Sequence, residues 1–334
     1  MHSAAIMRTA ATTVSPSAVS RPALGLPVAR GALDARATGV MTLLCLVWSL
    51  QQVSLKAIAG QASPMLMIAL RSLVAAGLLA ALMRWRGETT QRARWRPGAV
   101  VGALFALEFL LVAEALRLTY ASHVVVFLYT APIFAALGLQ WRLPTEGLKR
   151  MQWAGIALAF GGIVLAFLGG ADVPAGTAAR GVLLGDALAL LAGVAWGATT
   201  VTLRCTTLSS APATETLLYQ LLAAFFLLLP AAWLSGQWHF EPTTRVWAHL
   251  GFQSLVVSLA SFLTWFWLLR RYLASQLGVF SFLTPLFGVL LGVWLLGEAL
   301  EPRFVAGGSL VLAGIGLVSA GAGRLRGPGT RDAG

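Results

Sequence analysis

Apolar runs of about 20 residues follow one another from residue 39 to residue 322, separated by short breaks rich in turn-forming and charged residues. A helix of about 20 residues crosses the hydrocarbon core of a bilayer. Charged residues make up 11% of the chain, whereas a soluble globular protein carries about 25%. So few charges cannot cover a surface that faces water, which excludes a water-soluble enzyme. The chain is predicted to be an all-α membrane protein, because lipid does not tolerate unpaired backbone groups.

Ten membrane-spanning helices are predicted, forming two five-helix repeats at residues 38–170 and 178–323. Residues 1–37 are expected to be a disordered cytoplasmic tail, and residues 324–334 a second cytoplasmic tail. The least marked boundary lies between the third and fourth spans, where only Thr119 and Tyr120 separate two apolar runs. The predicted spans are residues 39–59, 63–83, 98–118, 121–141, 150–169, 181–204, 212–233, 247–269, 274–296 and 303–322.

Basic residues indicate the orientation of these spans. With the amino terminus in the cytoplasm, 18 of the 24 Lys and Arg residues fall on the cytoplasmic side, five fall outside, and Arg71 lies within the second span. Lys and Arg are concentrated in the cytoplasmic loops of membrane proteins. Both termini are therefore predicted to be cytoplasmic, with the protein in the inner (plasma) membrane. The net charge of +12 then reflects orientation in the bilayer and not binding of nucleic acid.

An internal repeat relates the two halves. A shift of 153 residues aligns the fourth and fifth predicted spans with the ninth and tenth, and a shift of 148 aligns the first with the sixth. The matched pairs include Pro132/Pro285, Trp141/Trp294, Arg150/Arg303, Trp48/Trp196 and Lys56/Arg204. Five spans are an odd number, so the second copy must enter the membrane from the opposite side. Inverted repeats build many secondary transporters, whose site lies at the repeat interface near the midplane.

These residues resemble the EamA-type transporters of the drug/metabolite transporter superfamily, over roughly residues 39 to 322. In the first half the motif residues are Trp48, Lys56, Pro64, Arg71, Pro132, Phe134, Gly155 and Gly161. In the second half they are Gly185, Asp186, Trp196, Pro285, Phe287, Gly297, Glu298 and Gly308. The resemblance implies a ten-helix inverted-repeat bundle that exports or exchanges small metabolites from a central cavity. Residues 143–146 depart from the family's usual Gly-Glu pair, which concerns one turn. The motifs are architectural and do not identify the substrate.

Catalytic and cofactor motifs are missing from the sequence. There is no Gly-x4-Gly-Lys-Ser/Thr loop, so ATP hydrolysis is not expected. The four histidines, His2, His123, His239 and His249, show no metal-ligand spacing with Cys or carboxylate residues. No catalytic residue, metal or cofactor is therefore predicted, and the chain is not expected to be an enzyme.

Polar and aromatic residues inside the spans are the candidates for a substrate cavity, because intramembrane polar groups are costly and tend to face a cavity or one another. Trp48, Gln51, Gln52 and Lys56 share one face of the first span, and Trp196, Thr199, Thr200 and Arg204 repeat the pattern on the sixth. The alternative is interhelical hydrogen bonding, with the end residues Lys56 and Arg204 snorkelling to the interface, which is favoured for those two. The predicted cavity-lining residues are Trp48, Gln52, Glu108, Tyr129, Trp196, Thr200, Ser261 and Phe282.

Glu108 is the sharpest candidate, since it lies ten residues into the third span and pairs with Ser261 in the repeat. An ionised carboxylate at the centre of a bilayer costs on the order of 3 kcal/mol. Glu108 is therefore predicted to exchange a proton during transport; the alternative is a protonated or hydrogen-bonded core glutamate. Arg71 is expected to bind helix-end carbonyls or a carboxylate, with a direct role in substrate binding as the alternative. Glu114 and Arg117 are expected to form an ion pair near the outer surface.

Prolines and glycines predict the shape of the bundle. Pro132 and Pro285 lie midspan, where each removes a backbone hydrogen bond and kinks its helix. Tyr129 and Phe282 precede them and are expected to form aromatic walls. Two Gly-x3-Gly pairs, at residues 193–197 and 288–292, predict close contacts between helices.

The predicted function is a secondary transporter that exports a small metabolite, such as an amino acid or a related amphipathic compound, by alternating access. The combination of aromatic, amide and carboxylate candidates favours this substrate class. Within transporters, the alternative is a nucleotide-sugar or drug substrate. From another class, a membrane-embedded enzyme or lipid-handling protein would need a cluster of acids or histidines at one interface, which the sequence does not show. The expected partners are a small-molecule substrate and the bilayer, and the sequence leaves open whether the chain is a homodimer.

Overall fold

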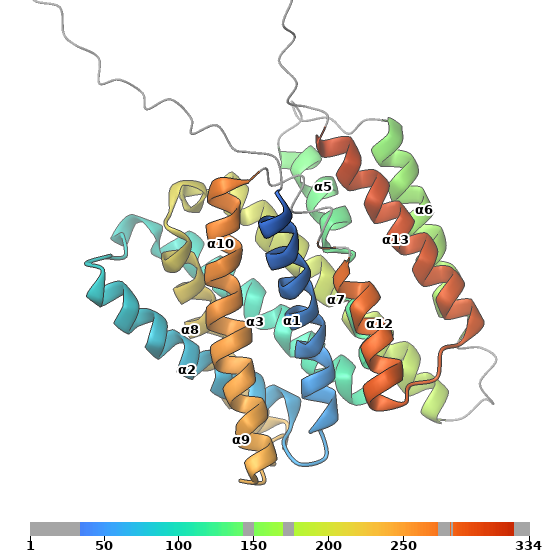
Figure 1. Ribbon diagram of the computed structural model, residues 1–334, viewed down its shortest axis with the longest axis horizontal. Coiled ribbons are helices and arrows are strands. Elements are labelled where there is room, and N and C mark those ends of the chain that lie inside the picture. Colours follow the sequence, from blue (N-terminus) through green and yellow to red (C-terminus); the bar gives the residue numbers. More distant parts are fainter. Residues whose placement is uncertain (1–33, 143–149, 170–176, 273–280, 282, 324–334) are drawn as a thin grey trace, which may run out of the picture.

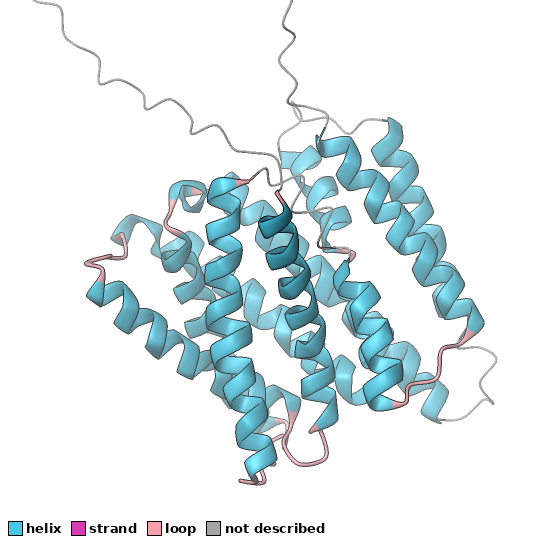
Figure 2. Cartoon of the chain, viewed as in Figure 1, coloured by secondary structure: helices cyan, strands magenta, loops and turns pink. Residues whose placement is uncertain are grey.

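The computed structural model describes residues 34–142, 150–169, 177–272, 281 and 283–323, and within these ranges the chain is built from helices (Figures 1 and 2). Short 3-10 turns follow α2 and α7, and a π-helical segment, η5, joins α9 to α10. The helices and this segment are α1 (Ala35–Ala57), α2 (Pro64–Trp85), α3 (Trp95–Leu118), α4 (Ala121–Leu128), α5 (Ala131–Arg142), α6 (Arg150–Gly169), α7 (Thr177–Cys205), α8 (Ala213–Leu234), α9 (Thr244–Gly251), η5 (Phe252–Ser261), α10 (Phe262–Arg271), α12 (Leu283–Leu296) and α13 (Pro302–Gly323).

Every predicted span contains helix in its described part. Seven helical stretches among the described residues are long and apolar enough to cross a membrane, and three shorter apolar helices, Arg150–Ala166, Leu283–Leu296 and Pro302–Leu317, account for the remainder. The membrane-protein class is thus supported, while the number of ten crossings stays a prediction. Residues 1–33 of the predicted tail at residues 1–37, and the whole predicted tail at residues 324–334, lie outside the described residues.

The first helix begins before the predicted boundary at residue 39, and residues 35–37 are helical where a disordered tail was expected. Asp34 caps it, because its Oδ1 accepts a hydrogen bond from the Ala37 amide at 2.7 Å. A side-chain oxygen at this position satisfies one of the amides that a helix start leaves unpaired. The same bond lowers the pKa of the Asp34 carboxyl below its ordinary value.

Equivalent helices of the two halves pack against each other in antiparallel directions. Along the contact of α6 with α13, Gly162 lies on Gly307 and Gly155 lies on Gly314. A Cβ atom added to Gly162 would stand 2.5 Å from the carbonyl oxygen of Gly307. The lack of side chains therefore lets these two backbones touch, which is how helices gain contact in lipid.

The pair formed by α2 and α8 shows the same antiparallel relation. At the start of α2, the Ser63 hydroxyl donates to the Gln237 carbonyl oxygen just beyond α8, at 2.5 Å. At the other end, the Thr214 hydroxyl in the first turn of α8 donates to Glu88 just beyond α2, at 2.5 Å. Each loop thus closes over the start of the opposite helix. An inverted repeat requires this exchange, because its two copies are related by a two-fold axis in the membrane plane.

Glycines end α2 and α8 at equivalent positions. Gly87 has φ 68° and Gly236 has φ 72°, a left-handed conformation that glycine adopts without steric cost. The next amides then bond back into the helices, Glu88 to the Met83 oxygen at 2.9 Å and Gln237 to the Ala232 oxygen at 2.7 Å. These bonds satisfy carbonyl groups at the helix ends. The repeat is therefore also seen in the conformation of the carboxyl ends of α2 and α8.

The predicted fourth span is broken in two, immediately before Pro132. α4 ends at Leu128, α5 begins at Ala131, and the Thr130 hydroxyl donates to the Phe127 carbonyl oxygen at 2.6 Å. α7 presses on this break through the glycine pair at residues 193 and 197, since a Cβ at Gly193 would stand 2.9 Å from the Phe127 carbonyl oxygen. In the second half, Pro285 lies in the first turn of α12, and residues 274–280 and 282 of that span lie outside the described residues.

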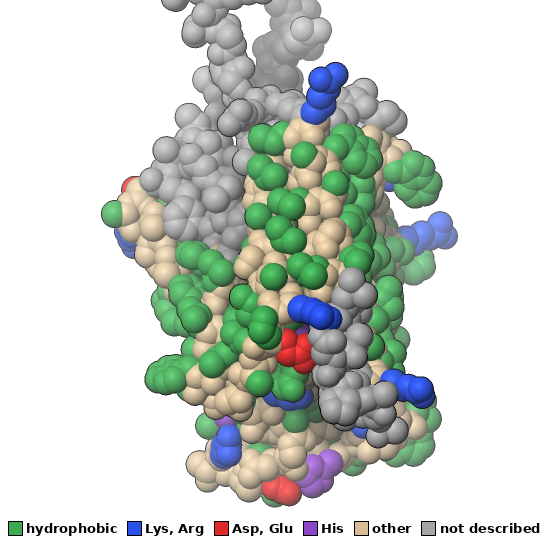
Figure 3. Space-filling model, turned by 90° about the vertical axis from the view of Figure 1, so that its right-hand side faces the viewer, with side chains coloured by type: hydrophobic (Ala, Val, Ile, Leu, Met, Phe, Trp, Pro, Cys, Tyr) green, Lys and Arg blue, Asp and Glu red, His purple; other side chains and the backbone are tan. Residues whose placement is uncertain are grey.

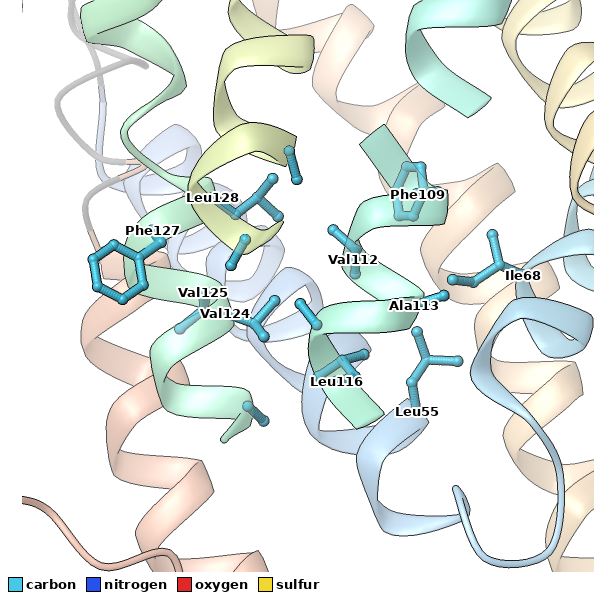
Figure 4. Packing of buried hydrophobic residues seen from close by; sticks show 14 of the residues in the cluster. Leu55, Ile68, Phe109, Val112, Ala113, Leu116, Val124, Val125, Phe127 and Leu128 are labelled. Carbon is cyan, nitrogen blue, oxygen red and sulfur yellow. The ribbon is translucent and has the colours of Figure 1, made fainter. Parts of the chain in front are cut away.

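Apolar side chains cover the outside of the bundle and also fill its core. Hydrophobic groups predominate on the α6 and α13 side, where charged side chains are few (Figure 3). Inside, Leu55, Ile68, Phe109, Leu116 and Phe127 pack together from α1, α2, α3 and α4 (Figure 4). Polar side chains such as those of Gln52, Arg71 and Glu108 are buried within the bundle, as expected where the surrounding solvent is lipid.

Replacing Gly162 by Ala is expected to destabilise the protein, because the new methyl group would collide with the α13 backbone. Overpacking of this kind costs about 1–3 kcal/mol. Gly161→Ala is the matched control, since a Cβ there meets nothing within 4 Å and both variants share the same gain in helix propensity. Thermal unfolding of the purified proteins in detergent measures the difference. Equal midpoints for the two variants would contradict the close contact between α6 and α13.

Candidate functional site

Two of the predicted site residues meet where α1 passes the end of η5. The Trp48 indole Nε1 donates to the Ser261 hydroxyl oxygen at 2.9 Å, and the Ser261 hydroxyl donates in turn to the Val257 carbonyl oxygen at 2.6 Å. The Trp48 ring also lies edge-on to Trp265, with centroids 5.5 Å apart. The first and eighth predicted spans are thus joined by residues that are 213 positions apart.

A second pair of predicted residues meets where α7 passes the end of α4. Tyr129, at the break between α4 and α5, lies edge-on to Trp196 of α7, with ring centroids 5.2 Å apart. One turn further along α7, the Thr200 hydroxyl donates to the Trp196 carbonyl oxygen at 3.2 Å. Thr200 therefore uses its proton within its own helix, and only its oxygen lone pairs remain for another group.

Gln52 is buried on α1 with its side-chain carbonyl oxygen lacking a hydrogen-bond partner among the described residues. A buried carbonyl oxygen without a partner loses its hydration without compensation. The remaining predicted lining residue, Phe282, lies outside the described residues.

Arg71 is held in the interior by an amide group. It is 2% exposed, and its Nη1 donates to the Gln253 Oε1 atom at 2.6 Å. Its guanidinium carbon stands 4.5 Å from the centroid of the Phe109 ring. Helix-end carbonyls or a carboxylate were predicted as the partner of Arg71, and this prediction was wrong. The hydrogen-bond partner is the neutral side chain of Gln253, and the aromatic face of Phe109 lies beside it.

Gln253 was not predicted, although it joins three helical elements. Besides accepting from Arg71, its Nε2 donates to the Gln51 carbonyl oxygen on α1 at 2.8 Å. It lies in the π-helical segment η5, and π-helical turns occur frequently at functional sites. The available signal was a run of buried polar residues in one apolar span: Gln253, Ser254, Ser258 and Ser261. Sequence periodicity did not reveal it because the π-helix changes the angular step between residues.

Glu108 lies in the middle of α3 and keeps 5% of its surface exposed. Its carboxyl group makes no hydrogen bond within the described part of the chain, so of the two alternatives to a proton-exchanging role the protonated core glutamate stays open. Arg71 and Tyr129 are close enough to interact with it electrostatically. Carboxylate, guanidinium and phenol thus gather from α3, α2 and the end of α4.

Charged residues at the end of the bundle where α1 and α3 finish have structural partners. Lys56 was expected to snorkel, but its Nζ donates to the carbonyl oxygens of Leu116 at 2.5 Å and Thr119 at 2.7 Å. These carbonyls lie at the carboxyl end of α3, where a cation complements the helix dipole. The predicted ion pair of Glu114 with Arg117 is present, at 2.9 Å.

Carboxylate side chains bind near the start of α4. Glu298 accepts from the amides of Ala121 at 2.6 Å and Ser122 at 3.0 Å, as an anion does at a helix amino terminus. Beside it, Asp186 accepts from the Thr119 hydroxyl at 2.5 Å and pairs with His123 Nδ1 at 3.0 Å. Among the described residues, no three His, Cys, Asp or Glu side chains are arranged to hold a metal ion.

Comparison with known proteins gives matches along most of the chain. The model of the EamA-like transporter family matches twice, at residues 37–168 and 183–320. An uncharacterized transporter from Archaeoglobus fulgidus is 26% identical over 294 residues, which cover 84% of this chain and 96% of that protein. A crystal structure whose description names no function shares 22% identity and a TM-score of 0.61, over 88% of this chain and all of the other. The crystal structure supports the fold alone.

Gln253→Leu is expected to destabilise the protein, because it leaves a buried guanidinium without its acceptor. A hydrogen bond to a charged group contributes about 1.5–3 kcal/mol. Ser254→Ala is the neighbouring control, since the buried Ser254 hydroxyl has no partner among the described residues. Unfolding midpoints in detergent compare the two. If Gln253→Leu unfolds at the temperature of the control, the amide does not hold Arg71.

Proposed function

The chain belongs to the EamA-like transporter family, and from this premise we propose that it is a secondary transporter that exports a small amphipathic metabolite of the amino acid type. Membership in this family supports a membrane transporter. The substrate class, the direction of transport and the coupling to protons are our proposal. The observation that supports it is the interior group of Arg71, Glu108 and Tyr129 within a bundle whose outer surface is apolar. Charged groups at this depth mark transport pathways.

The chemistry of the interior favours a small amphipathic substrate. Aromatic rings of Tyr129 and Trp196 offer apolar faces, while one carboxylate and one guanidinium offer charge. A nucleotide-sugar carries two phosphate charges, and Arg71 is the single cation of this group among the described residues. One guanidinium pairs well with a single anionic group, so the interior is a better match to a substrate of low net charge than to a nucleotide-sugar.

Glu108 supplies a route for proton coupling. An ionised carboxylate at this depth costs on the order of 3 kcal/mol, and the described residues give it no hydrogen bond. Binding a proton or a cationic group removes most of that cost. If the site faces the two sides of the membrane in turn, one proton can therefore enter on one side as substrate leaves.

The basic residues give the orientation, with both termini in the cytoplasm of a plasma-membrane protein. After Cys45 and Cys205 are replaced by Ala, a cysteine at Ser235 is expected to react with an impermeant thiol reagent added outside whole cells. A cysteine at Thr90 is expected not to react until the cells are opened. Both positions are exposed in the structure, so access to the thiol reports the side of the membrane. Labelling of Thr90→Cys in intact cells would reverse the orientation.

Export itself is tested by comparing intracellular and medium metabolites in cells with and without the protein. The metabolite that the protein moves into the medium is then followed in proteoliposomes with an imposed pH gradient. Glu108→Gln keeps the shape of the side chain and removes its titration. We expect this variant to reach the membrane but to lose the ability to concentrate the metabolite.

Glu114→Gln is the control for this experiment, since it removes a carboxylate from the same helix near the outer surface, where Glu114 pairs with Arg117. The control is expected to concentrate the metabolite as the wild type does. If Glu108→Gln also does so, proton coupling through Glu108 is wrong. An unchanged metabolite profile despite verified membrane expression would count against export as a whole.

A further inference from the structure

Two groups that can carry opposite charges lie inside the bundle without pairing with each other. Arg71 on α2 and Glu108 on α3 interact electrostatically, yet in the described residues they form no ion pair with one another. They are 2% and 5% exposed. Buried charges are normally paired and hydrogen-bonded, because desolvation otherwise costs several kcal/mol per ion. A direct pair would have been the simplest solution for two such neighbours.

Each of the two groups also keeps unused bonding capacity. Arg71 spends Nη1 on Gln253, while its buried Nε has no partner among the described residues. A guanidinium offers five N–H donors, and a carboxylate accepts through two oxygens. In the described part of the chain, the Glu108 oxygens accept none. The unpaired donors and acceptors therefore have opposite signs and lie on neighbouring helices.

We propose that Arg71 and Glu108 bind the two ends of a zwitterionic substrate, with the substrate's carboxylate on the Arg71 guanidinium and its ammonium group on the Glu108 carboxylate. This inference rests on the proposed function and names the charge class of the substrate. Phe109 lies directly beneath the guanidinium, and Tyr129 and Trp196 form an aromatic pair near the carboxylate. These rings suit the apolar side chain of an aliphatic or aromatic α-amino acid.

Charge balance favours a zwitterion over a singly charged ligand. With Glu108 ionised, an anion alone would pair Arg71 and leave Glu108 as an uncompensated charge until it bound a proton, and a cation alone would leave Arg71, which cannot lose its charge, uncompensated. A zwitterion pairs both groups and leaves the net charge of the interior unchanged. Removing one partner from a buried pair costs far more than removing both, because it leaves a naked charge in a medium of low polarity.

Gln253 gives the guanidinium its position in this arrangement. It fixes Nη1 from η5 and is itself fixed to the α1 backbone, so the remaining nitrogens of Arg71 are held in one orientation. An Arg–carboxylate contact is strongest when two parallel N–H groups meet both oxygens. Lys at position 71 would keep the charge but lose that planar pair of donors.

The test uses the full-length protein purified in detergent and isothermal titration calorimetry. The probes are L-phenylalanine, 3-phenylpropanoate, which lacks the ammonium group, and 2-phenylethylamine, which lacks the carboxylate; L-leucine and its two corresponding analogues form a second series. We expect the amino acid of at least one series to bind at least tenfold more tightly than both of its analogues. Binding of either analogue as tightly as the amino acid in each series that binds would overturn the proposal.

Two variants locate the charges. Glu108→Gln is expected to lose at least tenfold in affinity for the amino acid and to bind the carboxylate analogue no more weakly than the wild type does. Arg71→Lys is expected to weaken the amino acid and the carboxylate analogue alike, with the amine unaffected. The analogue series on the wild type decides the matter even if a variant fails to fold. If neither amino acid binds while cells still export another metabolite, the zwitterion proposal is wrong and the export proposal stands.

Discussion

The structure depends on one constraint: in lipid, every backbone polar group and every charge must find its partner inside the protein. Helices meet the backbone part of this requirement segment by segment, which accounts for a chain that is helical throughout its described spans. The side-chain part can be met only between helices. Polar groups such as Arg71 and Glu108 are accordingly buried in the interior, while hydrophobic side chains predominate on the face that α6 and α13 form (Figure 3).

The junction of α3 and α4 shows how the same constraint permits an interruption of the helix. Two helix ends meet there, leaving carbonyls on one side and amides on the other without partners within their own helices. Lys56 takes the carbonyls and Glu298 takes the amides. The two charges come from α1 and from the loop after α12. A local break thus ties together segments from both halves of the chain, which explains why a Gly-Glu turn can be an architectural motif of the fold.

The interior group around Arg71 and Glu108 is an exception, because its hydrogen-bonding groups are not all paired within the protein. Lys56, Asp186 and Glu298 each have their requirements met by the protein, whereas Glu108 has no hydrogen bond and Arg71 has an unpaired nitrogen in the described residues. Structural charges are satisfied and these two are not. Their unmet capacity is the physical reason for placing the substrate between them, and it links binding to the proton that Glu108 can carry.

Much of the architecture could be predicted from the sequence alone, because it depends on local properties of the chain. The apolar run lengths predicted where the helices lie, Pro132 marked the break that separates α4 from α5, and the odd number of spans in each repeat predicted that equivalent helices run in opposite directions. The depth of Glu108 followed from its place in an apolar run. The family resemblance was likewise carried by motif residues, and the family match is in agreement with it.

The tertiary structure decided which side chains meet. A helix that faces lipid on one side and an apolar core on the other is hydrophobic all round, so its sequence carries no stripe that fixes its rotation. Trp48 therefore could not be assigned to Ser261, nor Tyr129 to Trp196, before the helices were placed. The π-helical step of η5 brought Gln253 to Arg71, and the end of α3 lay where Lys56 could reach it. These contacts depend on packing between segments far apart in the chain, and periodicity within one segment does not encode them.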